Sequence, residues 1–97
     1  MPRYWIQLQG SGIEVPGHDY GDPEVTIRGF FVNRVVNAIS LAEAAERALA
    51  TVREEWASGP LSRYKAMPTL VVSHSEQLGF WRRLTARNSG YVFHPDA

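Results

Sequence analysis

The sequence predicts an α+β domain, a two-layer sandwich in which a mixed four-stranded sheet carries one main helix on one face. Three observations support this fold class. Apolar side chains alternate with a period of two near Tyr4 and near Phe30, they recur every three or four residues after Ser40, and Gly and Pro separate these segments. The order β-β-α-β-(α)-β indicates a ferredoxin-like or half-ferredoxin-like domain, and 97 residues suit one domain, 1–97.

The first strand is expected over residues 4–9, where every second side chain is apolar. Gly10-Ser11-Gly12 should interrupt this strand, and residues 13–15 should resume it briefly. Residues 16–24 contain two Pro, two Gly and three acids, which predicts a loop.

The second strand is expected over residues 25–39. Its more apolar face should lie against the helix, although this face includes a charged residue. The members of this face are Phe30, Val32, Arg34, Val36 and Ala38. The members of the opposite face are Phe31, Asn33, Val35 and Asn37.

A helix is expected to begin at Ser40, because Ser-x-x-Glu with Glu43 forms a capping box. Its apolar side chains fall on one stripe, and Gly59-Pro60 should end it. The stripe contains Leu41, Ala45, Ala48, Leu49, Val52 and Trp56.

The last third of the chain predicts two further strands. Residues 69–74 read as the third strand and residues 91–93 as a short final one. Leu78, Trp81 and Leu84 have helical spacing, which predicts one or two helical turns within residues 76–86.

Composition limits the classes of function. Ten basic and ten acidic residues cancel, so the chain lacks the overall field that attracts proteins to nucleic acids or anionic lipids. The absence of cysteine excludes disulfides and thiolate catalysis, and it fits a cytoplasmic location. The N-terminal residues contain no apolar signal region, and no run reaches the ~20 apolar residues of a membrane span. The sequence also contains no cofactor or metal motif.

One helix shields only one face of a four-stranded sheet. The other face should present Trp5, Phe31, Val35 and Val71, and exposed apolar patches of several hundred Å² are rare on monomers. We therefore expect a homodimer, or another partner, to cover this face. The leading hypothesis for function is a non-enzymatic dimeric module that binds a protein partner or a small ligand.

One segment of the chain reads Gly29-Phe30-Phe31-Val32-Asn33-Arg34-Val35-Val36-Asn37-Ala38, and it is followed by Glu43-Ala44 and later by Tyr91-Val92-Phe93-His94-Pro95. Together these segments resemble a set of small uncharacterised bacterial proteins. Their shared pattern is a G-F-F-x-x-R-x-V-x-A strand and a final aromatic strand before Pro. The order of two strands before a helix is also loosely similar to HicB-like antitoxin domains, although their usual Pro-Gly-Cys segment is missing here. Both resemblances imply a small α+β fold.

Arg34 is the most unusual residue of the second strand, because it shares a face with apolar side chains and a buried charge requires a partner. One interpretation is a clamp for an anionic ligand, with His74 beside it, as in a small sensor or enzyme. The alternative is an internal salt bridge to Glu14, Glu24 or a helix acid, or a bulge that turns Arg34 outward.

Two groups of residues are candidate metal or acid–base sites. His18, Asp19, Asp22 and Glu24 are ligand types, but their spacing matches no defined metal loop, so a solvated loop is the favoured interpretation. His74 and His94 could form a pair if their strands were neighbours, but ordinary histidines at strand edges are favoured.

A basic patch with interleaved aromatic residues occurs near the C-terminus. Its members are Trp81, Arg82, Arg83, Arg87 and Tyr91. This combination suits single-stranded nucleic acid, because arginines pair with phosphates and bases stack on aromatic rings. The alternative is a short helix with Trp81 packed inward and its arginines in solvent.

Overall fold

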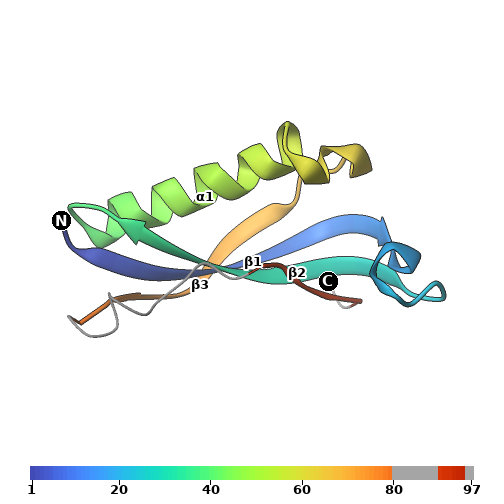
Figure 1. Ribbon diagram of the computed structural model, residues 1–97, viewed down its shortest axis with the longest axis horizontal. Coiled ribbons are helices and arrows are strands. Elements are labelled where there is room, and N and C mark those ends of the chain that lie inside the picture. The colour runs from blue at the N-terminus through green and yellow to red at the C-terminus, as the bar shows by residue number, and fades with distance from the viewer. Residues whose placement is uncertain (80–89, 96–97) are drawn as a thin grey trace.

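The computed structural model describes residues 1–79 and 90–95, and it confirms the two-layer α+β arrangement. The sheet consists of β1 (Arg3–Pro16), β2 (Thr26–Asn37), β3 (Thr69–Gln77) and β4 (Val92–His94). The helix α1 (Leu41–Ala57) lies along one face of this sheet (Figure 1). Two 3₁₀ turns, Gly17–Tyr20 and Pro60–Tyr64, complete the described elements. No helix among the described residues is long and apolar enough to span a membrane.

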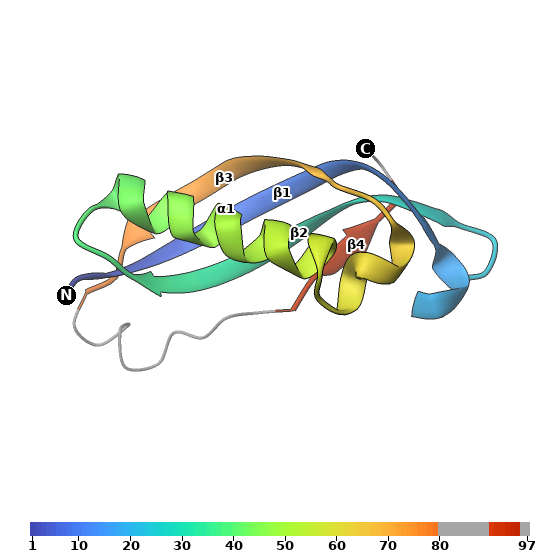
Figure 2. The ribbon, with the colours of Figure 1, turned by 90° about the horizontal axis from the view of Figure 1, so that it is seen from above.

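The strand order is β3-β1-β2-β4, and every neighbouring pair is antiparallel. The sheet is therefore antiparallel rather than mixed. The two strands that α1 connects, β2 and β3, do run in the same direction, but β1 lies between them. Viewed from above, the connection passes over the central strands (Figure 2). This is a split βαβ unit, which the ferredoxin-like class contains.

The first strand is longer than the alternation predicted, because it continues through Gly10-Ser11-Gly12. The β1–β2 register shifts between Ser11 and Val15, and Gly12 has φ 76°, a conformation that glycine adopts without steric penalty. This bulge changes which alternate residues point inward. Ile13 and Val15 are therefore buried in the core although they are out of phase with Leu8.

The core lies between α1 and the sheet. Ala44, Ala48, Val52 and Trp56 form the buried row of the helix, whereas Leu41, predicted in this stripe, is 42% exposed. Trp56 stacks on Phe30 of β2 with ring centroids 5.4 Å apart, so the largest side chains of the two layers meet directly.

Local signals set the ends of α1 as expected. The Ser40 hydroxyl accepts a hydrogen bond from the Glu43 N–H at 3.2 Å, while the Glu43 carboxylate pairs with Arg47 at 2.6 Å instead of returning to Ser40. Ser58 and Gly59 end the helix, and Pro60 opens the next turn.

The third strand runs to Gln77, so the predicted helical turns cannot begin at residue 76. The rest of that prediction falls on residues 80–86, outside the described residues.

The replacement Gly10→Ala should destabilise the fold by about 1–3 kcal/mol, since this is the usual effect of overpacking a core. A Cβ atom at Gly10 would overlap three atoms of the Phe30 ring. Chemical denaturation of both proteins measures the difference. Gly79→Ala is the matched control, because its Cβ would meet no atom within 4 Å. Equal free energies of unfolding for the two variants would contradict the packing of Phe30 over Gly10.

Candidate functional site

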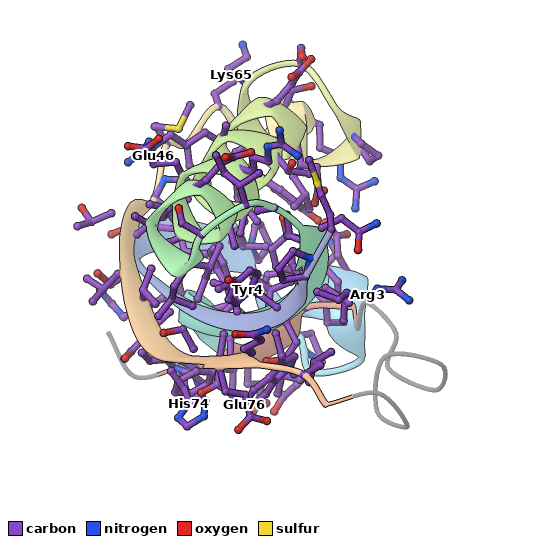
Figure 3. The ribbon with its side chains drawn as sticks, turned by 90° about the vertical axis from the view of Figure 1, so that its left-hand side faces the viewer. Arg3, Tyr4, Glu46, Lys65, His74 and Glu76 are labelled. Carbon is purple, nitrogen blue, oxygen red and sulfur yellow. The ribbon has the colours of Figure 1, made fainter. Side chains whose placement is uncertain are left out.

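The sheet face opposite α1 is the candidate functional surface, and we call it the open face. Figure 3 shows Tyr4 between the sheet and the helix, whereas His74 and Glu76 point away from the opposite side. No described helix or strand covers this side of the sheet (Figure 1). Three rows of side chains that cross the strands make up this face.

The outer row of the open face is Glu76, Trp5 and Val35, because Trp5 is the register partner of the other two. The middle row is His74, Gln7 and Asn33, joined in the same way by Gln7. The outer row is mixed and the middle row is polar.

The third row is apolar at three of its four positions and crosses all four strands. It runs from Val71 on β3 through Gln9 on β1 and Phe31 on β2 to Val92 on β4. Val71 is 57% exposed and Val92 is 63% exposed. Val71 and Val92 are thus the large apolar side chains of this face that are most open to solvent.

Aromatic contacts shield the two large rings of the open face. Trp5 lies against His74 with ring centroids 4.9 Å apart, and Phe31 lies against His94 at 5.3 Å. Both rings are consequently half-buried rather than fully exposed. The two large rings thus pack against neighbouring side chains of the same face.

The four residues predicted for a dimer interface, Trp5, Phe31, Val35 and Val71, lie together on this face. Val92 belongs with them but was missed. The signal for Val92 was weak, because its strand has three residues and its pairing with β2 depends on the tertiary fold.

The open face is nearly neutral. Glu76 is the one formally charged residue of the three rows, and its carboxylate lies 3.9 Å from His74 Nε2. A phosphate backbone would therefore meet no lysine or arginine within these rows. The surface suits contact with another protein better than contact with a polyanion.

Arg34 lies on the other side of the sheet, facing α1. Its Nη2 donates to both carboxylate oxygens of Glu55, at 2.9 and 3.0 Å, and its Nη1 donates to the Asn33 carbonyl at 3.1 Å. Tyr91 donates its hydroxyl to Glu55 Oε1 at 2.6 Å, and the Arg34 guanidinium stands 5.7 Å from the centre of the Tyr91 ring. Of the two interpretations of Arg34, the structure therefore confirms the internal salt bridge, and its partner is the helix acid Glu55.

This ion pair joins three elements. Arg34 comes from β2, Glu55 from α1, and Tyr91 directly precedes β4. Burial, and then the hydrogen bond and charge of Glu55, raise the pKa of the Tyr91 hydroxyl above its ordinary value. The sheet separates Arg34 from His74, so the structure does not bring these two predicted ligand residues together.

The polar loop residues pair with their neighbours. His18 Nε2 lies 3.1 Å from Asp19, Asp19 accepts from the Tyr64 hydroxyl at 2.8 Å, and Asp22 accepts from the Glu24 N–H at 3.2 Å. Within residues 1–79 and 90–95, no three His, Asp or Glu side chains are grouped to hold a metal ion.

The predicted histidine pair is separated by the strand order. His74 lies on β3 and His94 on β4, and these strands form opposite edges of the sheet. Of the predicted nucleic-acid patch, Trp81, Arg82, Arg83 and Arg87 lie outside the described residues. Its remaining member, Tyr91, is engaged with Glu55 and Arg34.

Comparison of the chain with protein-family models, with curated proteins and with solved structures finds no match. These comparisons therefore assign no function.

Replacing Arg34 by Met and Glu55 by Gln, singly and together, should reveal a coupling of about 1–3 kcal/mol in the free energy of unfolding, because this pair is mostly shielded from water. The Arg34 side chain is 11% exposed and that of Glu55 is 29% exposed. The matched control is the Arg47–Glu43 pair, where Arg47 is 52% exposed. Its coupling should be about 0.3–0.5 kcal/mol, the value for exposed helix pairs.

An anion-binding role for Arg34 makes the opposite prediction. Phosphate would then raise the melting temperature of the unaltered protein, and Arg34→Met would abolish this effect. A coupling no larger than that of the Arg47–Glu43 control would contradict the structural role of the pair.

Stability should fall as the pH rises above 10. Burial and the Tyr20 hydroxyl raise the pKa of Tyr64 to about 12, and burial also raises that of Tyr91. Because the unfolded tyrosines ionise near pH 10, the unfolded state gains stability from that pH upward, and for Tyr64 the loss is complete near pH 12. Tyr91→Phe and Tyr64→Phe should each flatten this dependence. Tyrosinate absorbance measures the titration, and simultaneous ionisation of all tyrosines near pH 10 would contradict it.

Proposed function

We propose that this chain is a non-enzymatic module that acts by association, as a homodimer that presents its surface to a protein partner or a small ligand. The observation that carries the proposal is the open face, a sheet surface with exposed Val71 and Val92 that no described element covers. We place the module in the cytoplasm, since a chain without cysteine has no need of an oxidising compartment.

The size of the open face suits a small interface. With strands about 4.8 Å apart and side chains on one face repeating about every 6.6 Å, the ten positions of its three rows extend over roughly 320 Å². Two such faces would bury roughly 640 Å², which is below the ~1,200 Å² of standard specific interfaces and in the range of weak, transient contacts. The dimer that we propose therefore dissociates on dilution.

The edge of the sheet is less suited to self-association. β3 is an edge strand, but the register shifts between Gln7 and Leu8, and the extra residue Ser73 donates its hydroxyl to the Gln7 side chain at 3.0 Å. Bulges of this kind discourage pairing with another strand. The broad face is thus the better candidate for contact.

Two alternatives have less support. Single-stranded nucleic-acid binding depends on Trp81, Arg82, Arg83 and Arg87, which lie outside the described residues. A small anionic-ligand sensor or enzyme depends on Arg34, whose guanidinium is paired with Glu55. Membership of the small bacterial family with the G-F-F-x-x-R-x-V-x-A strand is likewise a proposal from its motif.

Sedimentation equilibrium should give twice the chain mass of 10.9 kDa. Val71→Lys should weaken the dimer at least tenfold, because it places a charge in an apolar contact at a cost of more than about 1.4 kcal/mol. Leu41→Lys is the matched control, as Leu41 is 42% exposed on the opposite layer. A monomer at every concentration, or equal weakening by both variants, would refute the proposal.

A further inference from the structure

The apolar row of the open face has an internal symmetry. In the order β3-β1-β2-β4, Val71 and Val92 occupy the two edge strands, and Gln9 and Phe31 occupy the two central strands. Val71 and Val92 therefore lie at equal distances, counted in strands, on either side of the midline between β1 and β2. They are also the most exposed large apolar residues of the face, at 57% and 63%.

We propose that two copies pack face to face about a two-fold axis that runs along the strands, between β1 and β2. This inference rests on the proposed homodimer and specifies the symmetry axis that relates its two copies. The rotation exchanges left and right across the sheet, so Val71 of one copy meets Val92 of the other. Because an isologous contact occurs twice, both exposed valines of both copies are covered.

The same axis also brings side chains of the other two rows of the two copies opposite each other. Trp5 on β1 then faces Val35 on β2 of the second copy, which is an apolar contact. Gln7 faces Asn33 of the second copy, and both amides carry donors and acceptors. In these two rows, polar side chains thus meet polar ones and apolar side chains meet apolar ones. In the third row, Gln9 faces Phe31 of the second copy, which is the one polar–apolar pairing across this axis among the three rows.

The position of Glu76 also fits this axis. Glu76 lies on β3, so the rotation directs it toward the β4 side of the second copy. There, β4 pairs with β2 at Gly29, Phe30 and Phe31 and does not extend along Val35 among the described residues. Glu76 would consequently lie at the rim of the contact, where its carboxylate can stay hydrated.

A two-fold axis across the strands, through the polar middle row, is the main alternative within the same face. It would place Glu76 of one copy over Val71 of the other, and Trp5 over Gln9. Burying an unpaired carboxylate against an apolar side chain costs several kcal/mol. The axis along the strands avoids this cost at both edges of the dimer.

Cross-linking of single-cysteine variants tests the axis, because the chain contains no cysteine of its own. Packed sheets lie about 10 Å apart, which is too far for a disulfide but suits a bismaleimide of about 10 Å span. The variants are Val71→Cys and Val92→Cys, both at exposed positions, with circular dichroism to check folding. After subunit exchange, their mixture should give a covalent dimer.

Each variant alone should give none, because identical residues of the two copies are about 17 Å apart, combining three strand spacings and the gap between sheets. A mixture of Leu41→Cys with Val92→Cys is the matched control and should also give none. A self-linked Val71→Cys dimer, or no link in the Val71→Cys and Val92→Cys mixture of a protein that sediments as a dimer, would overturn the axis alone. A monomer by sedimentation would overturn the association function itself.

Discussion

The stack of Phe30 on Trp56 determines how the two layers meet. The Phe30 ring occupies the space above Gly10, where a side chain would collide with it, and it contacts Trp56 on its helix side. Tyr91 and Phe93 extend the aromatic cluster, with ring centroids 4.9 and 6.0 Å from Phe30. These residues all lie between α1 and the sheet. The chain thereby concentrates its aromatic packing on one side and leaves the other side to weaker cross-strand contacts.

The ion pair of Arg34 and Glu55 belongs to this packed side. It satisfies a guanidinium that would otherwise be expensive to bury, and Tyr91 completes the coordination of the carboxylate. The conspicuous charge of the second strand therefore acts within the fold. The surface that remains for a partner is made of ordinary residues, whose significance comes from their arrangement across four strands.

Patterns local to one segment predicted much of this structure. Strict alternation placed Phe30, Val32 and Arg34 on the helix side of β2, and the Ser40 cap placed the start of α1. The continuation of β1 was not predictable in this way, since Gly12 changes the phase of the alternation. Turn residues also signal such bulges, so a break and a bulge look alike in sequence.

Properties that depend on pairs of segments were harder to predict. The residues allowed several partners for Arg34, and only the tertiary placement of α1 selects Glu55. Likewise, nothing local to β3 or β4 shows that these strands form opposite edges, which separates His74 from His94 and places Val92 on the open face. The antiparallel order arises for the same reason, because the α1 connection skips one strand.

The bulge at Ser73 has a consequence for the size of any assembly. Strands that pair edge to edge can add copies without limit and so form filaments. Two faces related by a two-fold axis instead cover each other, so the assembly is closed at two copies. Because the extra residue Ser73 disrupts the β3 edge, it would favour a closed dimer over edge-to-edge assembly. In the dimer that we propose, this irregularity would oppose polymerisation through the β3 edge.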